Sequence, residues 1–307
     1  MAIPAASGYP QYSGNLIHPK FSSKLISRFY CSSVFADIST TEYSGDLKSC
    51  GDQITFFKEP EVVIGRLEKD GKIEHQTLVP ESVTMTINDR LYFSVKVDMD
   101  DEDMMCNWET WKEAFMKRAT YNMKQLIDKE LLTKLYAEVD PRSKGTTSAG
   151  YNFGAPTAPL ALTSTNILQV LSQINAQLCT LCSSGDDMFI VLPCEAQPLL
   201  MNSPILGQAY ASGLNESTLL TGKAPRKIAG FDVYFSTNVG TVADGPLPVF
   251  LIIAGRKDST AFAINNEGRF RVLPDKDSPD HFYQGFLIYG EKVIRKEGLA
   301  ALYATLA

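Results

Sequence analysis

Few residues of this chain have the type and spacing that chemistry needs. Cys179 and Cys182 form a CxxC pair, which is half of a structural zinc site, but no second pair and no nearby histidine supplies the other ligands. The three histidines, His18, His75 and His281, are far apart, and none lies in an HExxH pattern. Six cysteines in 307 residues also suggest no disulfide framework. The sequence therefore predicts no metal site and no cofactor.

The nucleophile and phosphate-binding motifs of enzymes are missing as well. Gly222-Lys223 lacks the surroundings of a P-loop, because Ser217 stands where the first glycine is needed and Ala224 follows the lysine. No GxGxxG follows an expected strand, and no GxSxG is present. We therefore predict a protein that is not an enzyme and has no catalytic residue. The alternative left open is a cytosolic hydrolase whose two carboxylates come together only on folding.

The composition is that of a globular protein with an acidic balance. Of the 307 residues 44% are hydrophobic, enough to bury a core, and the length suggests about two domains. The 29 basic and 35 acidic residues give a net charge of −6, whereas proteins that bind DNA through its phosphates use clustered lysine and arginine. The longest apolar stretch runs only from Val249 to Ala254, and no secretory signal is visible at the start. A cytosolic product is expected, and neither a membrane protein nor a dedicated nucleic-acid binder.

The block 53–98 contains the clearest strand pattern. Strands are expected at 54–57, 61–67 and 72–78, and Asp70-Gly71 between the last two is a strong signal for a hairpin turn. After Pro80 polar and apolar residues alternate, which predicts a strand with one solvated face. The apolar members of this alternation are Val83, Met85, Ile87, Leu91, Phe93, Val95 and Val97.

The tip of this hairpin is fully polar. Its charged residues are Arg66, Glu68, Lys69, Asp70, Lys72 and Glu74. An isolated two-stranded hairpin is only marginally stable in water, so a long arm of this kind needs another surface to lie against. Residues 1–30, with three prolines and no sustained helix or strand period, form a second extended arm. The receiving surface belongs to the same chain or to a neighbour, and the residues alone leave both open.

A long helix is expected at about 107–139, a stretch with good helix formers, no internal glycine or proline, and Pro141 beyond its end. The acidic cluster at 98–103 precedes it and suits the positive end of the helix dipole. Apolar residues step by four along the helix, namely Trp111, Phe115, Ala119, Met123, Ile127, Leu131 and Leu135. Each step turns the stripe by about 40°, so the helix must contact different elements along its length.

A second unit is expected after a connection at 141–165 that is rich in glycine, serine, threonine and proline. Its elements are a helix from Ile167 to Leu178, a buried strand at 188–192, a short helix at 195–201, a polar loop at 203–223, and strands at 231–236 and 248–254. The remaining residues alternate strands and turns. The mixture predicts an α+β fold without the regular βαβ order of a doubly wound sheet.

Read in order, these parts resemble the major capsid protein of tailed bacteriophages, which has the Hong Kong 97-type fold shared with encapsulin shells. FSSKLISRFYCSSVFADISTTEYSGDLKSCGDQITF at 21–56 is similar to the entry segment of that family, and the hairpin at 57–97 to its extended E-loop. The helix at 107–139 resembles the spine helix of the P-domain. MFIVLPCEAQPLL with GKAPRKIAGFDVYFSTNV resembles the A-domain, and GFLIYGEKVIRKEGLAALYA its closing segment.

The resemblance implies a division of the chain into six segments. These are the N-terminal arm and entry segment at 1–52, the E-loop hairpin at 53–98, the P-domain spine helix at 99–146, the A-domain at 147–257, P-domain return strands at 258–285, and an A-domain closing segment at 286–307. The resemblance covers the chain from about residue 20 to residue 305. Its specificity comes from the order and spacing of the parts, because no single motif is diagnostic.

The resemblance also implies partners. The subunits would form hexamers and pentamers of an icosahedral shell that encloses double-stranded DNA, assembled in the bacterial host cytoplasm. The arm and the E-loop would reach across neighbours, which makes the six charged tip residues candidates for inter-subunit contact. Only about 20 residues precede the matching region, so we expect a separate scaffolding protein, together with a portal and in some cases a decoration protein.

Some relatives cross-link their subunits through a Lys–Asn isopeptide bond helped by a glutamate. The candidates for such a bond are Lys58, Lys69 and Lys72 with Asn265, Asn266 and Glu267, all of which are also ordinary solvated residues. Two other functions stay open. An encapsulin-type compartment would hold cargo enzymes instead of DNA, whereas a tail-tube subunit would leave the long helix unexplained.

Overall fold

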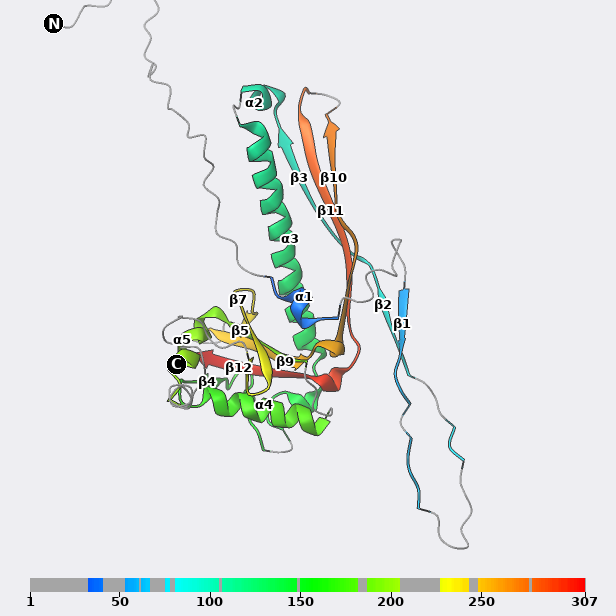
Figure 1. Ribbon diagram of the computed structural model, residues 1–307, viewed down its shortest axis with the longest axis vertical. Helices are drawn as coiled ribbons and strands as arrows, with labels where there is room; N and C mark the ends of the chain where they lie inside the picture. The colour runs from blue at the N-terminus through cyan, green and yellow to red at the C-terminus, as the bar shows by residue number, and fades with distance from the viewer. Residues whose placement is uncertain are drawn as a thin grey trace, which may run out of the picture.

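The computed structural model describes residues 33–40, 53–60, 62–66, 75–77, 81–104, 107–147, 150–181, 187–204, 227–242, 248–275 and 278–306. They form a lower domain around a seven-stranded sheet, an upper layer in which one long helix lies beside a three-stranded sheet, and a two-stranded arm (Figure 1). The chain passes between the two parts several times, so neither is a continuous piece of sequence.

The lower domain is built on strands that are apolar along most of their length. Three central strands, β5 (Met188–Pro193), β9 (Val249–Arg256) and β12 (Leu299–Leu306), are almost wholly buried, as is typical of strands covered on both faces. The order is β4 (Leu160–Leu162), β12, β9, β5, β7 (Phe231–Ser236) and β6 (Lys227–Ile228), with β8 (Thr241–Val242) paired to β9. The β4–β12 and β5–β7 pairs are parallel.

Helix α4 (Ile167–Leu181) runs along the lower side of this sheet (Figure 1). It buries Ile167, Val170, Leu171, Ile174 and Leu178, the spacing of one helix face. The short α5 (Gln197–Met201) follows β5 after one 3-10 turn (Cys194–Ala196). Further 3-10 turns lie at Pro141–Ser143, Lys257–Ser259 and Lys296–Gly298.

The upper layer consists of helix α3 (Trp108–Glu138) and a sheet of order β10–β11–β3. Strands β10 (Thr260–Pro274), β11 (His281–Val293) and β3 (Asp89–Val97) are all antiparallel. Figure 1 shows α3 standing beside this sheet, with its C-terminal end entering the lower domain. There Ile127, Leu131 and Leu135 join the main core.

The arm leaves the upper layer from the sheet side. Its two strands, β1 (Gln53–Phe57) and β2 (Ser82–Thr86), pair only with each other. Figure 1 shows the arm extending downward, away from the rest of the molecule. Two short helices complete the described elements, α1 (Phe35–Ile38) at the junction of the domains and α2 (Met99–Met104) before α3.

The long helix is confirmed almost to the residue, but its apolar stripe is only partly buried. Ile127, Leu131 and Leu135 are inaccessible to solvent, whereas Trp111, Phe115, Ala119 and Met123 are half-buried. The reason is geometric, because the three-stranded sheet covers one side of the upper part of α3, while the junction surrounds its lower part. The expected change of contacts along the helix is therefore present.

The single strand expected after Pro80 is wrong. The alternation breaks at Ile87-Asn88 into β2, which pairs with β1, and β3, which pairs with β11. The side chains keep alternating because each half has one buried face, although the two faces belong to different sheets. The strands expected at 61–67 and 72–78 are also wrong over their described residues, since 62–66 and 75–77 form no ladder.

The second unit follows its expected elements closely. The helix from Ile167, the strand at 188–192, and the strands at 231–236 and 248–254 correspond to α4, β5, β7 and β9. The apolar C-terminal segment is the strand β12. The expected segment boundary between 285 and 286 falls inside β11, and β3, expected within the hairpin, lies in the upper sheet.

Candidate interaction surfaces

The arm is fixed to the body at its base by a small apolar cluster. Met85 and Ile87 are buried against Ala261 and Ala263 of β10. On β11, Gly290 permits this close approach, because a Cβ there would lie 2.7 Å from a carbonyl oxygen of β2 and 3.1 Å from the Ile87 Cα. Small residues on the sheet thus let the base of the arm lie directly on it.

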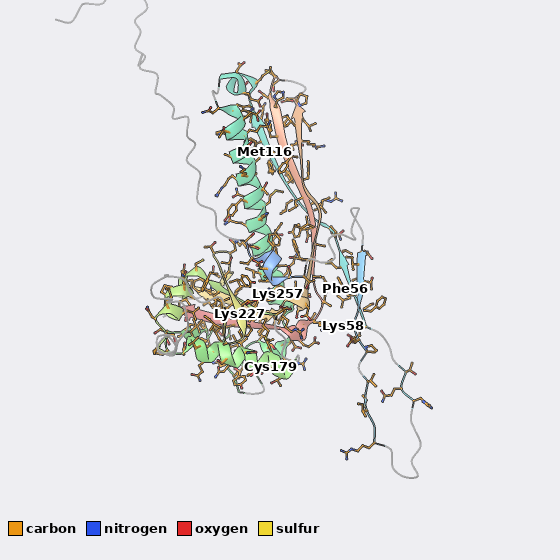
Figure 2. The ribbon with its side chains drawn as sticks, viewed as in Figure 1. Phe56, Lys58, Met116, Cys179, Lys227 and Lys257 are labelled. Carbon is orange, nitrogen blue, oxygen red and sulfur yellow. The ribbon has the colours of Figure 1, made fainter. Side chains whose placement is uncertain are left out.

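Beyond its base the arm exposes apolar side chains. Lys58, which Figure 2 labels next to the end of β1, and Glu81 extend the β1–β2 pair by one backbone hydrogen bond and an ion pair of 3.6 Å. Farther out, Val62, Val63 and Ile64 are 60%, 68% and 92% exposed. A run of exposed apolar residues on a projecting segment is typical of an interaction site.

A side-chain amide replaces the missing ladder in this outer part of the arm. The Gln76 Nε2 donates to the Val63 carbonyl at 2.6 Å, and the Val63 N–H donates to the Gln76 Oε1 at 3.2 Å. Both backbone polar groups of Val63 are thereby satisfied within the arm. The side chains around it are left to contact another surface.

Of the six expected contact residues, the structure describes only Arg66. Its side chain is exposed at the outer end of the described part of the arm. Glu68, Lys69, Asp70, Lys72 and Glu74 lie outside the described residues, as does the expected turn at Asp70-Gly71. The charges of the tip are visible in the sequence, whereas the exposure of the apolar run Val62–Ile64 is visible only in the structure.

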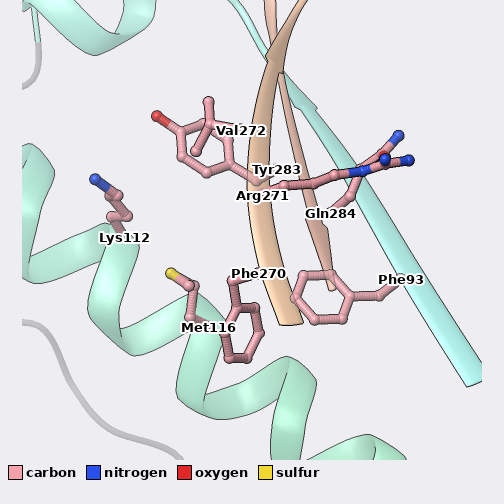
Figure 3. A pocket seen from close by; sticks show the side chains of 8 residues that line it. All are labelled: Phe93, Lys112, Met116, Phe270, Arg271, Val272, Tyr283 and Gln284. Carbon is pink, nitrogen blue, oxygen red and sulfur yellow. The ribbon is translucent and has the colours of Figure 1, made fainter. Parts of the chain in front are cut away.

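A shallow groove lies between α3 and the edge strand β10. Its lining residues are Phe93, Lys112, Met116, Phe270, Arg271, Val272, Tyr283 and Gln284 (Figure 3). Phe93 on β3 and Phe270 on β10 are the cross-strand partners of Gly285 on β11, and their ring centroids lie 5.8 Å apart above this glycine. A Cβ at Gly285 would lie 2.2 Å from the Phe93 ring, so only glycine allows this ring pair to form. Phe270 and Val272 remain about half exposed, 45% and 50%.

The upper end of this groove is held by an aromatic and charged cluster. The Tyr283 hydroxyl donates to the Glu102 Oε1 at 2.7 Å, and the Glu102 Oε2 lies 3.3 Å from the His281 Nδ1. The ring of Tyr283 packs edge-on against Trp108 and Phe115 of α3. Burial, and next the hydrogen bond to Glu102, raise the pKa of Tyr283 to about 12. The cluster ties α2 and α3 to β11.

The opposite face of the three-stranded sheet is also partly apolar. Tyr92 and Phe286 are direct cross-strand partners and are 74% and 36% exposed. The Arg271 guanidinium lies 4.8 Å from the Phe286 ring centroid and donates through Nε to the Gln284 Oε1 at 3.0 Å. This face combines aromatic rings with fixed hydrogen-bond donors, a composition that protein interfaces favour.

A network of charges joins α3 to both neighbouring strands of the sheet. The Lys134 Nζ lies 2.9 Å from the Asp89 Oδ2 and 2.8 Å from the Glu291 Oε1. Tyr289, fully buried, donates a short hydrogen bond to Glu130. The Glu291 side chain is only 4% exposed, and burial raises its pKa. These pairs fix the angle between helix and sheet, and no sequence pattern indicated them.

Asp128 is a buried carboxylate that joins three segments. It accepts from the Val34 N–H at 3.0 Å and the Phe35 N–H at 2.9 Å, which begin α1, and from the Asn238 Nδ2 at 3.3 Å after β7. Burial raises its pKa, opposed by these hydrogen bonds. Thr40, two residues after the end of α1, forms a parallel β-bridge with Ala261 of β10. The entry segment is therefore bound to α3, to β10 and to the lower domain at one point.

The remaining residues with chemical potential are dispersed. Cys179 is exposed on α4, and its Sγ donates to Asn175, while Cys182 lies outside the described residues (Figure 2). Among the cross-link candidates, Lys58 pairs with Glu81, Lys69 and Lys72 lie outside the described residues, and the side chains of Asn265, Asn266 and Glu267 fall outside the described ones.

Within the described residues, no group of three or more histidine, cysteine, aspartate or glutamate side chains has the arrangement of a metal site. Over the same part of the chain, no helix has the length and apolarity to span a membrane.

Comparison with solved structures identifies the fold. A structure from Mycobacterium phage Che8 superposes with a TM-score of 0.72 at 18% identity, covering 94% of this chain and 97% of the other. The capsid of Cyanophage P-SCSP1u matches with a TM-score of 0.67 at 13% identity over 95% and 94% of the two chains. The mature capsid of bacteriophage PhiM1 matches with a TM-score of 0.66 at 14% identity over 95% and 92%. No protein-family model matches the sequence, and no curated protein does.

These matches extend over nearly the whole of both chains, so they concern the complete arrangement of arm, helix and sheets. The chain has the Hong Kong 97-like fold of phage capsid subunits, and the expected α+β class is confirmed.

Proposed function

We propose that this chain is the major capsid protein of a tailed bacteriophage, which assembles into an icosahedral shell around double-stranded DNA. The observation that carries the proposal is the full-length likeness to phage capsid structures, 92% or more of each chain in the matches to P-SCSP1u and PhiM1.

The surfaces of the chain support a role in a closed assembly. The arm projects from the body with Val62, Val63 and Ile64 exposed, and the upper sheet exposes Tyr92 on one face and Val272 on the other. A shell is stabilised by many modest interfaces per subunit, because each additional contact becomes effectively intramolecular once the first has formed. Hexamers and pentamers joined in this way need no single strong contact.

The arm is the element that we assign to contact between neighbours. The contact residues that we expect at its tip are Arg66, Glu68, Lys69, Asp70, Lys72 and Glu74. Their charges have both signs, which suits pairing with a neighbour that repeats the same surface by rotation. A scaffolding protein, a portal and a decoration protein are further partners in this proposal, and the capsid of a virion is its location.

Expression of the chain, alone and together with the products of its neighbouring genes, tests the proposal. Negative-stain electron microscopy should show closed shells, and particles from an infected culture should contain DNA that resists added nuclease. Shells that contain protein cargo and no protected DNA would favour the encapsulin-type alternative. A monomer or small oligomer under every condition, measured by size-exclusion chromatography with light scattering, would refute the shell and revive the hydrolase alternative.

A further inference from the structure

One stretch of α3 has a charge opposite to that of the chain as a whole. Residues 117–129 contain four basic residues, Lys117, Arg118, Lys124 and Lys129, and a single acidic one, Asp128. Asp128 is inaccessible to solvent, and its carboxylate accepts hydrogen bonds from the Val34 and Phe35 amides. The accessible surface of this stretch is therefore cationic, although the net charge of the chain is −6.

The helix geometry gathers these cations on one side. At about 100° per residue, Lys117 and Lys124 lie about 20° apart around the axis, and Arg118 and Lys129 form a second row about 120° away. Lys117, Lys124 and Lys129 are exposed, and Arg118 is half-buried with its guanidinium over the Tyr121 ring. We call this surface the α3 basic face. Along the axis it extends for about 18 Å, at about 1.5 Å per residue.

The α3 basic face points away from the three-stranded sheet. Glu130, whose carboxylate accepts a hydrogen bond from Tyr289 of β11, lies about 100–140° around the helix from each of the four basic residues. Figure 1 shows the three-stranded sheet on one side of α3, and α1 lies against the lower end of the face, where the Val34 and Phe35 amides bond to Asp128. The Lys117–Glu113 ion pair, 3.6 Å long, reaches the upper end of the face, and both of its side chains are at least 70% exposed.

The chemistry of the α3 basic face fits a polyanion better than a folded protein partner. A stable protein interface needs buried apolar or aromatic anchors. The exposed large apolar residue of this stretch, Leu126, lies outside the face, about 60° beyond Lys129 and about 180° from Lys117. Tyr121 on the face is half-buried and is engaged by Arg118 and by the Gln125 amide. What remains is a row of flexible ammonium groups, which bind phosphates as point charges.

We propose that the α3 basic face binds the phosphate backbone of the packaged duplex DNA, without regard to its sequence. This inference rests on the proposed function, and it means that α3 faces the interior of the shell. Each copy would neutralise about three phosphates, so raising the salt from about 50 to 200 mM would weaken one site by about 40-fold. A contact this weak orders the outermost DNA through many copies without holding any segment firmly.

Amine footprinting of whole particles tests the proposal. DNA-filled particles and particles emptied of DNA are treated with an N-hydroxysuccinimide ester of acetate, and acetylation is measured by peptide mass spectrometry. We expect Lys124 and Lys129 to react several-fold less in the filled particles at about 50 mM salt, and this protection to be lost at about 200 mM. Lys227 and Lys296, exposed lysines of the lower domain, are the matched controls and should react alike in both (Figure 2 shows Lys227).

Three outcomes would overturn the inference. Equal reactivity of Lys124 and Lys129 in filled and emptied particles would show that DNA does not contact this face. Equal protection of Lys227 and Lys296 would indicate general shielding by the genome. Protection already present in DNA-free precursor shells would assign the face to a protein such as an acidic scaffold. In all three cases DNA-filled shells exist, so the proposed function would stand; if no such shells can be isolated, the proposed function itself fails.

Discussion

The buried carboxylate of Asp128 allows a quantitative test of how the entry segment is held. Replacing Asp128 with alanine removes the acceptor of three donors, the Val34 and Phe35 amides and the Asn238 side chain. A buried donor without a partner costs about 1–3 kcal/mol, and relief of the carboxylate's own desolvation offsets part of the sum. We therefore expect Asp128→Ala to weaken the attachment of α1 by about 2–3 kcal/mol.

Hydrogen exchange of the full chain reports this attachment locally. A loss of about 2–3 kcal/mol corresponds to an increase of about 30- to 150-fold in the exchange rate of the amides at 34–38, if they exchange by local opening. The matched control is Thr133→Ala on the same helix, whose hydroxyl donates to the Lys129 carbonyl of its own helix at 2.7 Å. Unchanged exchange of these amides in Asp128→Ala would refute the reasoning, whatever the global stability of the variant.

The pH dependence of the same group has a definite sign. Burial raises the pKa of Asp128 above its usual range, so the folded chain binds this proton more tightly than the unfolded chain does. The contribution of Asp128 to the free energy of unfolding therefore falls as pH rises from the unfolded pKa to the raised folded pKa, and is constant above it. Asp128→Asn does not titrate, so the stability of the wild type relative to this variant should fall through that window. A difference that rises with pH in urea titrations would contradict the assignment.

Three further predictions concern the fold and the arm. Gly285→Ala should lower the free energy of unfolding by about 2–4 kcal/mol in urea titrations, because its Cβ would lie 2.2 Å from the Phe93 ring and must separate the ring pair; a loss below about 0.5 kcal/mol would contradict it. Ile127→Asp should prevent folding, since it places an unpaired charge on a fully buried position and costs several kcal/mol, and a variant with native circular dichroism would show that the site tolerates charge. Deletion of residues 66–74 should leave a folded subunit that assembles poorly in electron microscopy, and a normal particle yield would remove the arm's tip from the contact between neighbours.

Local patterns were enough for the elements whose burial follows from their own periodicity. The absence of glycine and proline from 108 to 138 predicted the long helix, and the uninterrupted apolar run at 188–192 predicted the buried strand β5. The order of these parts was also sufficient for the resemblance to phage capsid subunits, whose fold is confirmed by the comparisons. The hairpin tip was named from its charges, and most of it lies outside the described residues.

Pairing partners, by contrast, were decided by the tertiary structure. The alternation from 82 to 97 is compatible with one strand or with two strands that meet near Ile87. Only the pairing of β2 with β1 and of β3 with β11 determines which sheet each half joins. The arm's exposed apolar run, the Asp128 junction and the ring pair above Gly285 each depend on residues far apart in the chain. The periodicity of a segment predicts which of its sides is buried, because that depends on the local spacing of apolar residues. It does not predict the partner that buries this side, because that partner comes from a distant part of the chain and meets it only on folding.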